Sequence, residues 1–271
     1  MNNLSLSPFY LWSVQGRLLG KRLGGRRKAS MKRKAIIVGA SSGIGREVAK
    51  LLLADGWCLG IAARRQEPLL ELKAMAPNRV GVMPIDVTKP EAGELLQELI
   101  RQTGGMDLYF HASGIGHQNR TLEEDVEMRT LETNAVGFAR MTGAAYRYFA
   151  KQGVGHIACI TSIAGTKGLG PAPAYSATKA FQATYLQALE QQARQRGLNI
   201  AITDIRPGFV DTALLGDGYP YPMLMRPENV AQDIVDSIYH RRHIRIIDWR
   251  YRILTFLWRI VPDWLWRRMR I

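Results

Sequence analysis

Short apolar runs separated by longer amphipathic stretches recur along most of the chain. The apolar runs predict strands at residues 35–38, 57–63, 79–85, 106–111, 155–161, 199–204 and 243–247. Apolar residues at helical spacing predict helices at residues 90–101, 122–151, 175–196 and 227–240, and another directly after the first strand. Strands that alternate with helices in this way form parallel sheets. We therefore expect an α/β fold with a single doubly wound parallel sheet and helices on both faces.

A glycine-rich turn follows the first predicted strand and opens a helix. Its residues, with the glycines spaced G-x-x-x-G-x-G, include Gly39, Ser41, Ser42, Gly43, Ile44 and Gly45. Glycines let the backbone approach a pyrophosphate closely, and the N-terminus of the next helix offers free N–H groups and the positive end of its dipole. The turn therefore predicts the phosphate-binding part of a dinucleotide site.

The second predicted strand ends in Ala63-Arg64-Arg65, where many NAD enzymes have an acid that binds the adenosine ribose. A carboxylate there would repel a 2′-phosphate, whereas arginine can hold one with charge-assisted hydrogen bonds. Arg64 and Arg65 therefore favour NADP(H) over NAD(H). The alternative is that both are ordinary solvated loop charges.

Ser162, Tyr175 and Lys179 form the candidate catalytic group. Ser162 ends the fifth predicted strand, and Tyr175 and Lys179 are four residues apart on one face of a predicted helix. Pro171 and Pro173 predict a connection that is not helical before Tyr175. A phenol has a pKa near ~10 in water, so a tyrosine that acts as an acid near neutral pH needs a cation such as Lys179 nearby. A Tyr-x-x-x-Lys pair on its own, however, is commonly no more than a surface pair on a helix.

The formal charge of +14 is concentrated at the two ends of the chain. Residues 1–30 carry +6, residues 241–271 carry +7, and the residues between them carry +1. A near-neutral central region argues against a nucleic-acid groove on the folded body. Cys58 and Cys159 each lie in an apolar run, which favours buried free thiols and a reducing cytoplasmic setting over a disulfide framework.

Three segments differ in composition. Residues 1–30 are basic and free of acids, so we expect a mostly disordered N-terminal extension before a catalytic domain at residues 31–248. Residues 249–271 hold four of the six tryptophans, interleaved with arginines, and Pro262 interrupts them. No run in this tail reaches the ~20 apolar residues of a membrane span. Tryptophan with arginine is typical of an amphipathic helix among lipid headgroups, and packing on its own domain or a dimer mate is the equal alternative.

The chain from about residue 34 to residue 248 resembles the short-chain dehydrogenase/reductase family. The motifs that agree in order and spacing are the glycine turn, Asp86-Val87, Asn134, Ser162, Tyr175 with Lys179, and Pro207-Gly208. The resemblance implies a Rossmann-type fold and catalysis by Asn134, Ser162, Tyr175 and Lys179. Tyr175 would protonate a carbonyl oxygen as hydride arrives, and Ser162 would hydrogen-bond that oxygen. Lys179 would lower the pKa of Tyr175 and bind the nicotinamide ribose, and Asn134 would hold a water that links Lys179 to solvent.

The resemblance also implies which residues bind the cofactor. Besides the glycine turn, Arg64 and Arg65, these are Asp86, Val87, Ser113, Gly114, Tyr175, Lys179, Pro207, Gly208, Val210 and Thr212. Val38 and the run His111-Ala-Ser113-Gly114 depart from the residues that the family usually has there. A catalytic role for His111 is open, but a lone histidine at the end of a strand is more often structural.

We therefore expect an NADP(H)-dependent oxidoreductase that reduces a ketone or oxidises the matching secondary alcohol. Residues 209–226 are rich in Leu, Gly, Tyr, Pro and Met, which is typical of a mobile flap over an apolar or lipid-like substrate. The alternative from another class is a non-catalytic NADP(H)-binding sensor or scaffold with the same fold. No metal and no nucleic-acid partner are predicted, and the resemblance implies a homodimer or homotetramer. We expect the protein in the cytoplasm, either free or bound peripherally at the inner membrane surface.

Overall fold

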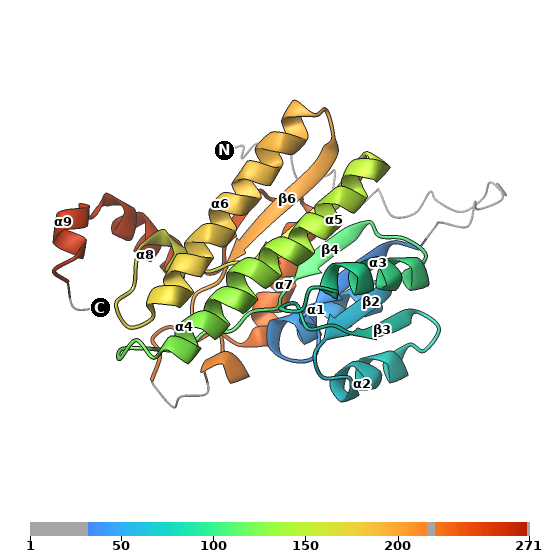
Figure 1. Cartoon of the computed structure of the whole chain (residues 1–271), viewed down its shortest axis with the longest axis horizontal. Coiled ribbons are helices and arrows are strands. Elements are labelled where there is room, and N and C mark those ends of the chain that lie inside the picture. Colours follow the sequence, from blue (N-terminus) through green and yellow to red (C-terminus); the bar gives the residue numbers. More distant parts are fainter. Residues whose placement is uncertain (1–31, 216–219, 270–271) are drawn as a thin grey trace, which may run out of the picture. The chain divides into compact units, whose positions relative to one another are not determined.

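Parallel strands form the central sheet of the protein (Figure 1). The computed structural model describes residues 32–215 and 220–269, and within them seven strands lie in the order β3-β2-β1-β4-β5-β6-β7. The strands are β1 (Lys34–Val38), β2 (Cys58–Ala63), β3 (Val80–Pro84), β4 (Leu108–His111), β5 (Val154–Ile160), β6 (Asn199–Arg206) and β7 (Ile244–Ile246). The strand order reverses between β1 and β4, which is where doubly wound sheets open a ligand crevice. The predicted fold class is confirmed.

Both faces of the sheet are buried, and this explains why its strands are continuous apolar runs. Along β1, Ala35 and Ile37 pack into one core, and Ile36 and Val38 pack into the other. The first core is covered by α1 (Gly43–Ala54), α2 (Glu67–Met75) and α7 (Pro227–Tyr239). The second is covered by α3 (Ala92–Thr103), α5 (Phe138–Gln152) and α6 (Pro173–Gln195), with α4 (Glu124–Leu131) against α6. Figure 1 shows α5 and α6 side by side across this face.

Helix α2 is an element that the apolar pattern does not predict. Only Leu69 and Leu72 of its nine residues are buried, so no apolar stripe marks it. Arg46 of α1 holds it instead, because its guanidinium donates to the carbonyl of Pro68 at 3.1 Å and to Glu71 at 2.7 Å.

Two predicted boundaries are corrected by the structure. The long helix expected at residues 122–151 is divided by a π-helical turn, η3 (Glu132–Gly137), so that α4, η3 and α5 follow one another. Pro173 does not keep the chain from being helical before Tyr175; it is the first residue of α6. Proline suits this position because the first N–H groups of a helix have no partner within the helix.

The C-terminal tail forms α8 (Trp249–Ile260) and α9 (Asp263–Trp266), with Pro262 between them. Tyr251 and Thr255 of α8 and Trp266 of α9 are buried. Within the described ranges, no helix is both long and apolar enough to cross a membrane. The extension expected at residues 1–30, and residues 216–219 of the expected flap, lie outside the described residues.

Candidate active site

The predicted site residues gather where the strands end. Gly39 follows β1, Ser113 follows β4, Ser162 follows β5 and Pro207 follows β6. Parallel strands end at one edge of the sheet, so these positions surround one crevice. The segments touch, because a Cβ on Gly39 would lie 2.5 Å from the amide nitrogen of Ser113 and the N–H of Ile163 donates to the carbonyl of Pro207 at 3.1 Å.

The glycine turn is too tight for side chains. Gly39 has a φ of +94°, which other residues rarely adopt. A Cβ on Gly45 would lie 2.2 Å from the carbonyl oxygen of Gly39. Ser42, the N-cap of α1, makes no side-chain capping bond, so the first N–H groups of the helix are open to an anion. Ser41 is partly buried beside it, and Ile44 packs against the first core.

Charged residues lie at the ends of β2 and β3. Arg64 and Arg65 are exposed, and within the described part of the chain neither guanidinium forms an ion pair or hydrogen bond. Asp86 accepts hydrogen bonds from the backbone and hydroxyl of Thr88 at 3.0 and 2.8 Å. Although burial opposes it, these bonds and the charge of Arg64 hold the pKa of Asp86 below its usual value. Val87 is buried beside Asp86.

Asn134 is fully buried in η3. Its side chain binds one residue of the loop after β4, because Nδ2 donates to the carbonyl of Ile115 at 2.7 Å and Oδ1 accepts from its N–H at 2.9 Å. At the end of η3 the N–H of Phe138 bonds to the carbonyls of Thr133 and Ala135 and not to that of Asn134. The Asn134 carbonyl instead accepts from Nε2 of Gln182 at 2.8 Å. The π-helical turn therefore leaves the backbone carbonyl of Asn134 available to Gln182, while the Asn134 side chain binds the loop after β4.

Tyr175 lies in the first turn of α6 and faces the loop after β4. A Cβ on Gly116 would lie 2.8 Å from the tyrosine ring, so Gly116 makes room for it. Ser162 is held beside the ring, and its Oγ accepts from the N–H of Ala164 at 3.1 Å. Burial raises the pKa of Tyr175, and the hydrogen bond with Ser162 offsets part of the rise. The sequence leads us to expect a pKa lowered by Lys179, but the pKa is raised, because burial disfavours the charged phenolate.

Lys179 reaches under the site from the same face of α6 and is 4% exposed. Its Nζ donates to the carbonyl of Ile160 at 3.3 Å and to Oε1 of Gln182 at 3.0 Å. The same atom lies 5.6 Å from the centre of the Tyr175 ring. Burial lowers the pKa of Lys179 to about 8, although the negative charge of Asp204 attracts the proton. The ammonium is therefore near its titration point at mildly alkaline pH.

The flap expected after β6 is anchored by the tail. A Cβ on Gly208 would lie 2.2 Å from the ring of Tyr251 in α8. The Tyr251 hydroxyl accepts from the N–H of Phe209 at 3.2 Å and shares its one proton between the carbonyls of Pro222 and Met223 at 3.0 and 3.1 Å. One buried tyrosine thus joins both ends of the flap to α8.

The start of the flap reaches the glycine turn. The methyl group of Thr212 lies 3.2 Å from the position of a Cβ on Gly43. Val210 pairs with Met225 in an isolated bridge, and both side chains are buried. Thr212 also lines a hollow of about 660 Å³ with Asp211, Ala213, Arg226, Pro227 and Glu228. Gly114 completes the predicted set, since a Cβ there would lie 3.3 Å from Oδ1 of Asn134 and 3.7 Å from Nζ of Lys179.

His111 is buried behind this crevice at the end of β4. Its Nδ1 lies 2.7 Å from the hydroxyl of Tyr109. Burial and the charge of Lys179 lower its pKa to about 3, so the imidazole stays neutral near pH 7. These contacts favour the structural role.

Known proteins are similar to most of this chain. The profile described as "short chain dehydrogenase" matches residues 33–219. The chain belongs to the short-chain dehydrogenase family. An oxidoreductase of Myxococcus xanthus is 31% identical over 249 residues, which cover 88% of this chain and 98% of that protein. An oxidoreductase of Staphylococcus aureus is 30% identical over 217 residues, which cover 78% and 93%.

Two solved structures share the fold. A short-chain dehydrogenase from Streptomyces avermitilis has a TM-score of 0.73 at 23% identity, with 83% of this chain and 92% of that chain covered. An actinorhodin polyketide ketoreductase solved with NADPH has a TM-score of 0.67 at 24% identity, with 76% and 90% covered. This protein is thus an oxidoreductase of the short-chain dehydrogenase family, a family that binds nicotinamide cofactors.

Sequence reasoning missed two residues of this short-chain dehydrogenase that contact the site. Gln182 is three residues after Lys179, a spacing that puts both on one face of α6 and could have revealed it. Tyr251 carries no such signal, because its bond to Phe209 spans 42 positions of sequence.

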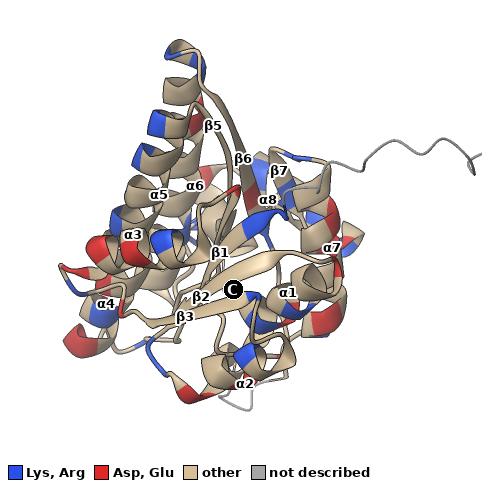
Figure 2. Ribbon diagram, turned by 90° about the vertical axis from the view of Figure 1, so that its right-hand side faces the viewer, with Lys and Arg blue, Asp and Glu red and all other residues tan. Residues whose placement is uncertain are grey.

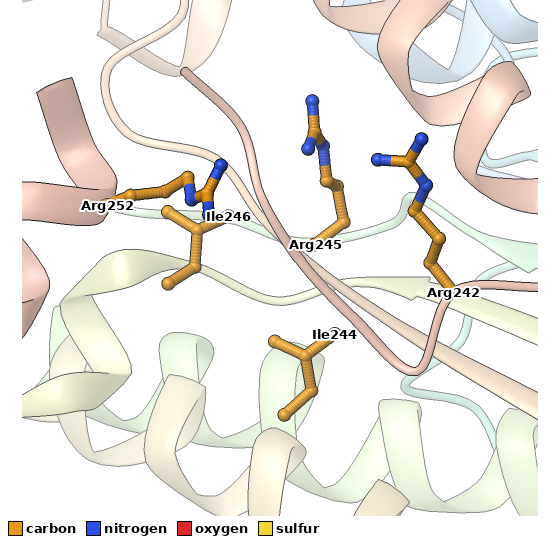
Figure 3. A pocket seen from close by; sticks show the side chains of 5 residues that line it. All are labelled: Arg242, Ile244, Arg245, Ile246 and Arg252. Carbon is orange, nitrogen blue, oxygen red and sulfur yellow. The ribbon is translucent and has the colours of Figure 1, made fainter. Parts of the chain in front are cut away.

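A second hollow, lined mainly by arginines and isoleucines, lies at the β7 edge of the sheet. Its volume is about 290 Å³, and it is lined by Arg242, Ile244, Arg245, Ile246 and Arg252. Arg242 and Arg245 extend to one side of the segment and Ile244 to the other (Figure 3). Both arginines are paired with acids of α7, Arg242 with Asp236 at 3.0 Å and Arg245 with Asp233 at 2.8 Å. These pairs join β7 and the turn before it to α7, and none of the predicted site residues lines the hollow.

Proposed function

We propose that this short-chain dehydrogenase uses NADP(H) to reduce a ketone, or to oxidise the matching secondary alcohol, on an apolar or lipid-like substrate. The observation that carries the proposal is the meeting of Ser162, Tyr175 and Lys179 with Asn134 at the edge of the sheet where the glycine turn lies. A non-catalytic sensor has no need for a buried lysine beside a tyrosine and a serine.

The residues present fit a dinucleotide cofactor. The backbone of the glycine turn fills the space that side chains would take, and the first N–H groups of α1 are open to a pyrophosphate. Arg64 and Arg65 are free to bind a 2′-phosphate at the end of β2. Thr212 lies at the other end of the turn, where it would contact the nicotinamide.

The side chains supply the proton chemistry. When bound, NADPH would provide the hydride for the carbonyl carbon. Tyr175 gives its phenolic proton to the carbonyl oxygen, and Ser162 hydrogen-bonds that oxygen as charge develops on it. The ammonium of Lys179 stabilises the phenolate until a proton from solvent replaces the one transferred. In the oxidation direction the phenolate of Tyr175 takes the alcohol proton.

A sensor without activity predicts a different result in a direct assay. We expect the purified protein to consume NADPH with apolar ketones such as 2-decanone or acetophenone, at a rate above the background without ketone. NADPH binding without turnover on a wide panel of ketones and aldehydes would favour the sensor.

We expect Arg64→Ala with Arg65→Ala to weaken NADPH binding about 10- to 100-fold, because a hydrogen bond between charged groups contributes about 1.5–3 kcal/mol. The affinity for NADH, which lacks the 2′-phosphate, should change less than about threefold. Cofactor fluorescence titration measures both. Arg196→Ala, an equally exposed change at the far end of α6, is the control. Equal affinity of the unmutated protein for NADH and NADPH would contradict the proposal.

Helix α8 supports a contact with a membrane surface. Its inward face carries Tyr251, Thr255 and Trp258, which pack on the domain. The opposite face is also apolar and is exposed; it consists of Trp249, Ile253, Phe256, Leu257 and Ile260. When a helix is apolar on both faces, the outer face is stable only if another apolar surface covers it.

The charges around this face support an anionic bilayer as the proposed cover. By helical spacing, Arg250, Arg252 and Arg259 fall along the borders between the two faces of α8. Arg267 and Arg268 follow beside the exposed Trp264, and β7, which carries one basic residue, Arg245, lies next to α8 (Figure 2). Arginine and tryptophan at the rim of an apolar face suit the headgroup layer.

We expect the full-length protein to sediment with vesicles that contain phosphatidylglycerol but not with pure phosphatidylcholine. Phe256→Ser with Trp264→Ser should weaken sedimentation more than about tenfold, because each side chain loses about 1.5–3 kcal/mol of apolar burial. Leu70→Ser, at an exposed leucine of α2, is the matched control. If the double variant instead halves the mass in light scattering, the outer face of α8 covers a second copy and the membrane proposal fails.

The surface that we assign to pairing of two copies lies on the long helices. Apolar side chains are exposed there on α4, η3 and α6; they are Met128, Leu131, Val136 and Phe181. A homodimer or homotetramer through this face would leave α8 open to the bilayer.

A further inference from the structure

Gln182 stands between two residues of the proposed catalytic set. Its side chain is fully buried, its Oε1 accepts from Nζ of Lys179 at 3.0 Å, and its Nε2 donates to the carbonyl of Asn134 at 2.8 Å. The orientation of the amide is fixed by its partners, because an ammonium only donates and a carbonyl only accepts. A direct protein bridge therefore links Lys179 to Asn134.

We propose that Gln182 is a positioning residue, whose buried amide keeps the ammonium of Lys179 charged and in place under Tyr175. The proposal rests on the proposed function for its catalytic consequence, but not for its electrostatic part. A hydrogen bond to the charged form of a buried group favours that form. Two protein acceptors, Gln182 and the carbonyl of Ile160, hold the ammonium, which has three donors. The third donor would then remain for Tyr175 or a cofactor hydroxyl.

Other titratable groups also lie near Lys179, and they affect its charge to different extents. Asp204 in β6 attracts the proton. The thiol of Cys159 in β5 would do so only as a thiolate, and burial raises the pKa of that thiol far above its usual value, so it stays protonated. His111 in β4 is neutral and adds no charge near pH 7. Asp204 is already shared, since Arg206 and Thr161 both bind it. The Gln182 side chain, by contrast, accepts a hydrogen bond from the ammonium directly. Burial disfavours the charged form of Lys179, and this hydrogen bond offsets part of that effect.

The bridge also limits how a proton can travel. A water between Lys179 and Asn134 could pass a proton by exchanging its donors and acceptors. A neutral amide keeps its N–H groups on nitrogen and its lone pairs on oxygen. A proton that returns to Tyr175 therefore comes from the open side of the site and not along Gln182.

The test compares Gln182→Met, which keeps the volume but removes the strong acceptor, with Gln182→Glu, which places a carboxylate against the ammonium. NMR of ¹³Cε-labelled lysine, with Lys179→Met to assign the signal, follows the pKa of Lys179 without cofactor or substrate. We expect Gln182→Met to lower this pKa from about 8 by about one unit or more, and Gln182→Glu to raise it. The alkaline limb of the kcat profile with NADPH should move in the same direction in each variant. Gln187→Met, the same change on the exposed face of α6, should move neither.

Two results would overturn the proposal. One is an unchanged Lys179 pKa in both Gln182 variants, and the other is a uniform loss of kcat at every pH without displacement of the limb. If Gln182→Met does not fold, the isosteric Gln182→Glu still decides, because only an electrostatic contact raises the pKa. A Lys179 pKa that shifts as expected in a protein whose Tyr175→Phe variant keeps full activity would refute the proposed function and leave the bridge intact.

Discussion

Tyr175→Phe should lower the turnover of NADPH with a ketone by about 10²- to 10⁴-fold, the usual contribution of a general acid. The change removes one oxygen atom and its proton. The ring remains against Gly116, because the contact with the Cβ position of that glycine involves ring carbons. Binding of NADPH, measured by fluorescence, should stay within about twofold, since the glycine turn and the arginines supply most of the phosphate contacts.

Tyr185→Phe is the matched control for this experiment. Tyr185 lies on α6 as well and is partly buried, but its ring stacks on Phe181 and its hydroxyl has no contact with Ser162 or Lys179. Its loss should leave kcat and cofactor affinity unchanged. A Tyr175→Phe enzyme that works at nearly the normal rate would refute the assignment of Tyr175 as the acid, whatever its effect on stability.

The fold could be predicted from the sequence because the inner strands of the sheet, such as β1, are buried on both sides. Ile36 and Ile37 enter different cores, so both must be apolar, and the strand stands out as a continuous run. The glycine turn is equally local, since its tightness depends on residues within one short segment of chain. Such features depend on residues that are close in sequence, so they can be predicted without knowledge of tertiary contacts.

Features that depend on distant contacts could not be predicted in this way. The π-helical turn at Asn134 buries an asparagine and a glycine, so the spacing of apolar residues does not reveal it. Helix α2 is mostly exposed and is held by Arg46 from another helix. The bonds of Gln182 to Asn134 and of Tyr251 to Phe209 join segments 48 and 42 positions apart. In the sequence, nothing in the composition distinguishes Gln182 or Tyr251 from the other glutamines and tyrosines.

The tail links the two proposals about substrate and membrane. Tyr251 of α8 holds the ends of the flap, while Nε1 of Trp266 in α9 donates to the carbonyl of Gly168 at 2.8 Å. Lys167, next to that carbonyl, pairs with Asp263 of α9. Both tail helices therefore bind loops that border the crevice. A bilayer against the outer face of α8 would lie beside the flap, which is where an apolar substrate would enter.

Gly45→Ala should raise the dissociation constant for NADPH about a hundredfold or more, because the added methyl group would lie 2.2 Å from the carbonyl oxygen of Gly39 and 3.0 Å from the methyl group of Ala112. The carbonyl oxygen of Gly39 is a backbone atom, so it cannot move away by a change of rotamer as a flexible side chain can. The start of α1 must then move away from β1 by about 1 Å, a displacement that typically costs a positioned site about 10²-fold. The N–H groups that face the pyrophosphate move with it.

Gly170→Ala separates this effect from the general cost of replacing a glycine. Gly170 has no atom within 4 Å of its Cβ position, so its replacement should leave NADPH affinity and the melting temperature nearly unchanged. Circular dichroism of Gly45→Ala should still show the folded α/β spectrum, since the sheet itself is not altered. NADPH affinity within about threefold of the unmutated protein would mean that the phosphates do not lie on this turn, and the cofactor site would have to be sought elsewhere along the edge of the sheet.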